Sequence, residues 1–124
     1  MTTSTSNGVV LFAHGSRDPL WRAPIEAVQT YIQTHHPQVP VRCAYLELTT
    51  PDLSQAVQEL VDAGSEAITI VPMFLGTGKH AREDLPVLLE DLRMRHPQVR
   101  ITAQAAIGED PRLTALMATI ACSQ

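Results

Sequence analysis

Three side chains in this 124-residue chain, two imidazoles and one carboxylate, follow apolar runs that read as buried strands. His14 comes directly after the run from Val9 to Ala13, and Glu47 lies near the end of a second run. His80 stands six residues beyond Phe74, where a third run ends. Two imidazoles and a carboxylate suit a divalent transition metal ion, and imidazole also accepts protons near neutral pH. These residues predict a metal site, provided that the fold brings them together.

Four apolar runs are short and rich in Val and Ile, which is typical of strands that are covered on both faces of a parallel sheet. They are Val9–Ala13, Val39–Leu48, Ala67–Phe74 and Val99–Ala106.

Helical spacing of apolar residues fills the gaps between these runs. The predicted helices cover about Leu20–His35, Leu53–Val61, Leu85–Leu92 and Leu113–Ile120. For the second helix we expect Thr50 as the cap, Pro51 at the first helical position and Gly64 at the exit. For the last helix we expect a cap at Asp110, followed by Pro111.

Strands alternating with helices predict an α/β fold, a three-layer α/β/α sandwich around a four-stranded parallel sheet of order 2-1-3-4. We expect residues 1–8 to be a disordered lead-in and residues 9–124 to form one domain. Ligands of such sheets bind at the carboxyl ends of the strands, so His14 should lie centrally, flanked by Glu47 and His80. Each of the three also has an ordinary interpretation, as a loop, helix-start or solvated edge residue.

Charge and motifs exclude several function classes. The net charge is −4, which argues against nucleic-acid binding, and no segment is apolar enough to predict a membrane span. The two cysteines and the absence of a signal peptide favour the cytoplasm. The stretch "LGTGKH" is not a phosphate-binding Walker motif, and no G-x-S-x-G nucleophile motif occurs.

Positive side chains gather in the loops that carry His14 and His80, although the chain as a whole is acidic. This favours a polycarboxylate ligand, the alternative being a set of solvated loop cations. The four residues are Arg17, Arg22, Lys79 and Arg82.

Three motifs together resemble the short, single-domain form of the CbiX-type sirohydrochlorin chelatases. They are "LFAHGSRDP", "YLEL" with the following Pro51, and "VPMFLGTGKHAREDLP". The resemblance covers nearly the whole chain from Val9 and implies a chelatase-like, flavodoxin-like half domain that works as a homodimer. It implies ATP-independent insertion of Co²⁺, or of Fe²⁺ or Ni²⁺, into sirohydrochlorin on the way to cobalamin or sirohaem. The metal is then a substrate, and no prosthetic group is expected.

The resemblance also assigns roles to residues of this chain. His14 is similar to the metal-binding histidine and proton acceptor, His80 to the second metal ligand, and Glu47 to the acidic group at the substrate site. The macrocycle-contacting loop corresponds to Leu75, Gly76, Thr77, Gly78 and Lys79. Arg17 joins these substrate-binding residues through its charge. The main alternative is a non-enzymatic carrier that uses the same ligands to hold cobalt or nickel.

Overall fold

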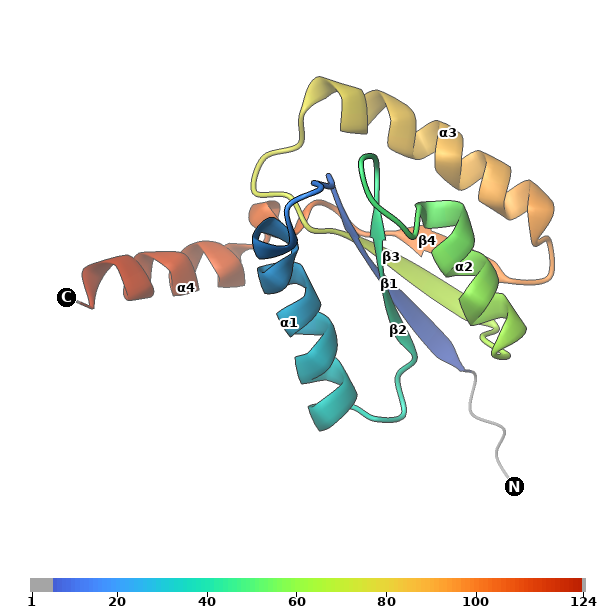
Figure 1. Ribbon diagram of the computed structural model, residues 1–124, viewed down its shortest axis with the longest axis horizontal. Coiled ribbons are helices and arrows are strands. Elements are labelled where there is room, and N and C mark those ends of the chain that lie inside the picture. The colour runs from blue at the N-terminus through green and yellow to red at the C-terminus, as the bar shows by residue number, and fades with distance from the viewer. Residues whose placement is uncertain (1–5, 124) are drawn as a thin grey trace.

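The computed structural model describes residues 6–123 and contains a sheet of four parallel strands (Figure 1). Strands and helices alternate as the sequence predicts, with a short 3-10 helix, η1, before the last helix. The elements are β1 (Asn7–Ala13), α1 (Pro19–His35), β2 (Val41–Tyr45), α2 (Leu53–Asp62), β3 (Ala67–Pro72), α3 (Lys79–Arg95), β4 (Arg100–Ala103), η1 (Ile107–Glu109) and α4 (Pro111–Cys122). The sheet order β2-β1-β3-β4 confirms the predicted order and places β1 between β2 and β3.

The side chains of β1 are buried on both faces of the sheet, as a parallel sheet requires. Val10 and Phe12 pack with residues of α2 and α3 on one face. Leu11 and Ala13 point to the opposite face, where the apolar residues of α1 cover them. The three layers that the sequence predicts are therefore confirmed, with α1 on one side and α2 and α3 on the other.

Three helix starts are capped by aspartates, Asp18 for α1, Asp52 for α2 and Asp110 for α4. Asp110 caps α4 as predicted and accepts a hydrogen bond from the Arg112 N–H. The expected start of α2 is wrong, because Asp52, not Thr50, is the cap. The Asp52 carboxylate accepts from the Gln55 N–H while the Gln55 side chain accepts from the Asp52 N–H, a reciprocal pair that outcompetes a single threonine hydroxyl. Pro51 consequently lies before the cap.

The chain start differs from the expected lead-in. β1 begins at Asn7, because Asn7 and Gly8 pair with Ala67 and Ile68 of β3, and backbone pairing needs no apolar side chain. Residues 1–5 of the expected lead-in lie outside the described residues. The single domain over residues 9–124 stays a prediction.

The last helix, α4, lies outside the three layers. It continues from η1 and extends away from the sheet (Figure 1). None of the described residues of α4 is buried. Among residues 6–123, the helices are also too short or too polar for any of them to span a bilayer.

Candidate functional site

His14 and Glu47 meet at the carboxyl ends of β1 and β2, where the sequence places them. The backbone pairing continues beyond the two strands, since the Leu46 N–H donates to the Ala13 carbonyl at 2.9 Å. The Glu47 N–H then donates to the His14 carbonyl at 3.1 Å. This register holds the two side chains together, with His14 Nε2 at 4.0 Å from Glu47 Oε2. We call these two residues the His14–Glu47 pair.

The His14–Glu47 pair is open to solvent, with exposed side-chain fractions of 53% and 54%. Two metal–ligand bonds of about 2.1 Å span up to about 4.2 Å, so one ion is able to contact both atoms at their present separation. Further coordination positions would remain for water or for a substrate nitrogen. The pair is thus suited to an ion that must be exchanged rather than held permanently.

Gly15 makes the close approach of the two loops possible. The backbone of Gly15 has a φ of +114°, which residues other than glycine rarely adopt. A Cβ atom at this position would also lie 1.9 Å from the Glu47 carbonyl oxygen. A glycine is therefore required between His14 and the turn into α1. The sequence carried this signal in the motif "HGS", although the contact with Glu47 could not be inferred from it.

Phe74 supports the imidazole of His14 from the side of β3. The two rings meet edge to face, with centroids 6.4 Å apart and planes at 70°. Phe74 is itself buried and packs edge to face on Phe12 at 6.1 Å. This aromatic contact joins the imidazole to the buried core, a role that the position of Phe74 at the end of an apolar run did not indicate.

His80 is not grouped with the other two predicted ligands. It is the second residue of α3 and is exposed, and the loop from Met73 to Gly78 separates it from the end of β3. Within residues 6–123 no group of three His, Cys, Asp or Glu side chains is arranged to hold a metal ion. The expected set of two imidazoles and one carboxylate is therefore incomplete in the single chain, and the His14–Glu47 pair is the part that the fold assembles.

The loop before α3 rests on η1. The Gly108 N–H donates to the Phe74 carbonyl at 2.9 Å. A Cβ atom on Gly108 would lie 2.0 Å from the Leu75 carbonyl oxygen, so the two backbones are in direct contact. Leu75 itself is exposed. No local pattern points to Gly108, because its partner lies 33 positions earlier in the chain.

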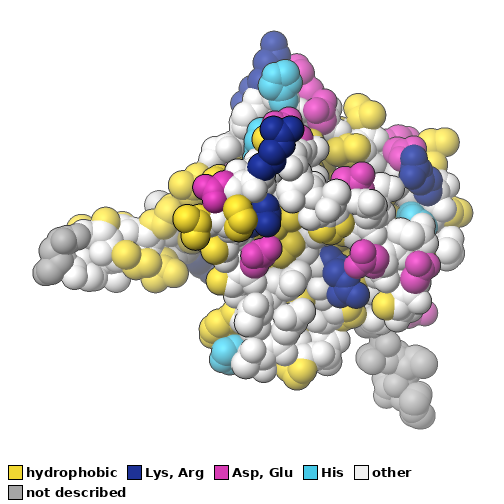
Figure 2. Space-filling view, in the orientation of Figure 1, with side chains coloured by type: hydrophobic (Ala, Val, Ile, Leu, Met, Phe, Trp, Pro, Cys, Tyr) yellow, Lys and Arg dark blue, Asp and Glu magenta, His cyan; other side chains and the backbone are white. Residues whose placement is uncertain are grey.

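The cations of this edge fall into two groups. Arg22 and Arg82 donate to the carbonyls of Ser16 and Thr77, at 3.2 and 3.3 Å, and so brace their own loops. Arg17 and Lys79 are exposed, and neither forms an ion pair with another residue in the part of the chain that the structure describes. Figure 2 shows Lys, Arg and His side chains at the end of the molecule where α3 begins, with Asp and Glu side chains next to them. The exposed cations Arg17 and Lys79 thus lie in the two loops that flank the His14–Glu47 pair, among side chains of both signs.

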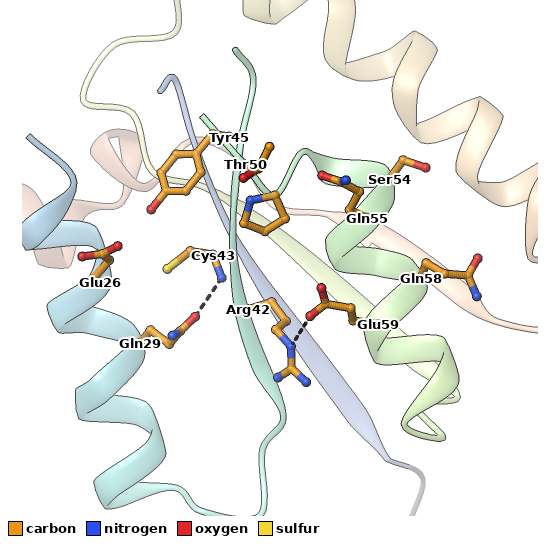
Figure 3. Close-up of a pocket in the computed structure, with 11 residues that line it drawn as sticks. Glu26, Gln29, Arg42, Cys43, Tyr45, Thr50, Ser54, Gln55, Gln58 and Glu59 are labelled. Carbon is orange, nitrogen blue, oxygen red and sulfur yellow. Dashed lines mark hydrogen bonds and ion pairs between the residues drawn. The ribbon is translucent and has the colours of Figure 1, made fainter. Parts of the chain in front are cut away.

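A pocket of about 800 Å³ lies elsewhere, along the outer edge of β2 between α1 and α2 (Figure 3). Its polar groups are largely paired: Gln29 accepts from the Cys43 N–H, and Arg42 bonds Glu59, both at 2.9 Å. Burial raises the pKa of the Cys43 thiol, and burial likewise raises the pKa of Tyr45 to about 12. Neutral, desolvated groups of this kind are poor metal ligands and nucleophiles, so this pocket does not compete with the His14–Glu47 pair.

Comparison with known proteins identifies relatives over most of the chain. The family model CbiX matches residues 8–122. A sirohydrochlorin cobaltochelatase from Saccharolobus solfataricus is 30% identical over 112 residues, 86% of each chain. One from Methanopyrus kandleri is 35% identical over 81 residues, which are 65% of this chain and 57% of that protein. The match thus spans less than two thirds of the Methanopyrus relative.

Two solved structures share the fold. A CbiX protein from Marinobacter aquaeolei VT8, described as a cobalamin biosynthesis protein, has a TM-score of 0.80, 32% identity and 93% coverage of both chains. The sirohydrochlorin chelatase SirB from Bacillus subtilis subspecies spizizenii, in complex with cobalt, has a TM-score of 0.77 and 26% identity. The match covers 92% of this chain and 49% of SirB, so SirB has room for a second unit of this size.

Proposed function

This chain belongs to the CbiX family, and from that premise we propose that it inserts a divalent metal ion into sirohydrochlorin without ATP. Co²⁺ is the proposed substrate metal, with Fe²⁺ and Ni²⁺ as alternatives. The observation that carries the proposal is the His14–Glu47 pair, a ligand and a proton acceptor held side by side at the carboxyl edge of the sheet. The relatives named sirohydrochlorin cobaltochelatase support the choice of macrocycle and metal.

Metal insertion sets two tasks that suit this pair. The ion must lose water and be held loosely enough to leave for the macrocycle, and two pyrrole protons must be accepted. In the proposed mechanism the His14 imidazole and the Glu47 carboxylate share these tasks. His80 stays the proposed second metal ligand, and it would have to reach the ion in the substrate complex, because the free chain does not group it with the pair.

The acidic macrocycle would be bound by exposed cations at this edge of the sheet. Sirohydrochlorin carries several carboxylates, and the exposed cations Arg17 and Lys79 lie in the two loops that flank the pair. The backbone of the loop from Leu75 to Lys79 has small or absent side chains at Gly76 and Gly78, where a Cβ would meet nothing within 4 Å. A flat ligand could therefore approach this backbone closely.

The proposed assembly is a homodimer in the cytoplasm, without nucleic acid or membrane partners. A single chain leaves the His14–Glu47 pair more than half exposed, whereas ligand sites enclose most of their ligand. The SirB chain is about twice as long as the part that matches, so its remaining half is long enough to enclose the ligand site from the other side. In the proposed homodimer a second copy of this chain would take that place. The free cysteines Cys43 and Cys122 and the net charge of −4 are consistent with this location and partner set.

The experiment that tests the function follows the absorbance of sirohydrochlorin with Co²⁺ under anaerobic conditions without ATP. We expect the protein to accelerate cobalt insertion by on the order of 10²-fold or more over the uncatalysed rate, with multiple turnovers. A protein that binds Co²⁺ in equilibrium dialysis and leaves the insertion rate unchanged would instead be the metal carrier.

A further inference from the structure

Leu48 directly follows Glu47 and has a backbone conformation that leucine rarely adopts. Its φ is +70°, in the left-handed region. Among residues 6–123 the other residues with positive φ are Gly15 and Gly64, so Leu48 alone carries a side chain at such a position. The left-handed region disfavours leucine, whereas glycine and asparagine tolerate it. The strained residue is thus the neighbour of the His14–Glu47 pair in the chain, and backbone strain of this kind clusters at functional sites.

The loop that carries Leu48 is held in place at both of its ends. On the outgoing side the Glu47 N–H donates to the His14 carbonyl at 3.1 Å. On the returning side the Pro51 carbonyl accepts from the Tyr45 N–H at 3.0 Å. Figure 1 shows this loop, between β2 and α2, extending past the end of β1 at the carboxyl edge of the sheet. The backbone therefore sets the position of Leu48.

The side chain of Leu48 is open to solvent beside the candidate site. Leu48 is 49% exposed, whereas Leu46, two residues earlier, is partly buried and packs against the core beneath α2 and α3. Leu75, in the loop that follows β3, is 67% exposed. Because the sheet order is β2-β1-β3-β4, these two exposed leucines lie in the loops on either side of His14. The edge thus offers apolar contacts as well as charged ones.

We propose that Leu48 is a substrate-contacting residue, whose side chain packs on a face of the tetrapyrrole ring while the His14–Glu47 pair contacts the metal ion. The inference rests on the proposed function and adds a specificity-determining residue to it. Sirohydrochlorin carries its carboxylates at the periphery, and the faces of its ring are apolar. Ligand sites accordingly combine many apolar side chains with a few polar ones. Packing on the ring would remove the exposed part of Leu48 from water, which offsets the backbone strain.

The test replaces Leu48 with asparagine, which tolerates the left-handed backbone and has no apolar surface to pack on the ring. We expect Leu48→Asn to unfold at the wild-type temperature or up to about 5 °C higher, because the strain is relieved. Its Kd for sirohydrochlorin, measured by equilibrium dialysis without metal, should rise about 5–10-fold, because about half of a leucine side chain no longer becomes buried on binding. The Kd for Co²⁺ should stay within about twofold, since the His14–Glu47 pair is unchanged.

Two control variants isolate the apolar contact. Leu48→Met keeps an apolar side chain of similar volume, so it should bind sirohydrochlorin within about twofold of the wild type. Met94→Gln makes a similar change of polarity at an exposed residue near the end of α3, away from the loop that carries His80. This variant should leave the Kd for sirohydrochlorin unchanged.

Three results would overturn the proposal. They are a wild-type Kd for sirohydrochlorin in Leu48→Asn, an equal loss of affinity in Leu48→Met, and a fall of more than about 5 °C in the unfolding temperature of Leu48→Asn, which would show that the leucine serves the fold. A protein that binds sirohydrochlorin through Leu48 but does not accelerate cobalt insertion would count against the proposed function alone. A wild type that does not bind sirohydrochlorin would contradict both.

Discussion

Replacing His14 with alanine is expected to lower kcat/KM for cobalt insertion into sirohydrochlorin by on the order of 10³-fold. The substitution removes a ligand of the incoming ion and a group that is placed to accept pyrrole protons, and a positioned proton acceptor alone contributes roughly 10²–10⁴-fold. Glu47, at 4.0 Å from Nε2, would remain without its partner. The loss should appear in the anaerobic absorbance assay, with the unfolding temperature little changed, because His14 is more than half exposed.

Two comparison variants locate this effect at the pair. His36→Ala removes an exposed imidazole at the end of α1 and should leave the insertion rate within about twofold of the wild type. Glu47→Gln keeps the shape of the side chain and removes its charge, so it should alter the pH profile of the rate more than the KM for Co²⁺ if the carboxylate accepts protons. A His14→Ala protein that retains most of its activity would show that the pair has been given the wrong role.

Replacing Gly15 with alanine is expected to destabilise the fold by about 3–5 kcal/mol and to lower the insertion rate on the order of 10²-fold. The new Cβ meets the Glu47 carbonyl oxygen at 1.9 Å, and the φ of +114° adds backbone strain. Relief of this contact must move the Glu47 loop away from His14 by an ångström or so, and such displacements cost about 10²-fold in rate. Chemical denaturation and the absorbance assay measure the two effects.

Gly64→Ala is the control variant that separates the effect of backbone strain from the effect of the close contact between residue 15 and Glu47. Gly64 also has a positive φ, +98°, and a Cβ there would meet nothing within 4 Å. This variant should therefore cost only about 1–2 kcal/mol and leave the insertion rate unchanged. If Gly15→Ala and Gly64→Ala behave alike in both measurements, the close approach of Gly15 and Glu47 does not position the pair.

The sheet and the His14–Glu47 pair can be predicted from local patterns in the sequence. Runs such as Val9 to Ala13 are apolar at every position and too short for a buried helix, which favours a strand with two covered faces, and the alternation with helices favours a parallel order. That order brings His14 beside Glu47 because His14 directly follows β1 and Glu47 lies two residues beyond β2, the paired neighbour of β1. Strand ends and their immediate successors are therefore predictable from the sequence.

The rest of the site depends on contacts that no local pattern records. His80 follows a six-residue loop, so its position depends on how that loop packs rather than on strand register. The support by Phe74 and the contact of Gly108 with Leu75 join residues that are distant in the chain. The period of α4 correctly predicted a helix with an apolar face, but periodicity is the same whether the face packs within one chain or between two.

The most direct test of the His14–Glu47 pair as the metal site is the location of cobalt in crystals of this protein soaked with Co²⁺, measured by anomalous scattering at the cobalt absorption edge. We expect a peak about 2.1 Å from His14 Nε2, with the Glu47 carboxylate beside it, and we expect this peak to disappear in the His14→Ala protein. Cobalt bound at His80 or elsewhere, with His14 Nε2 free of metal, would contradict this expectation.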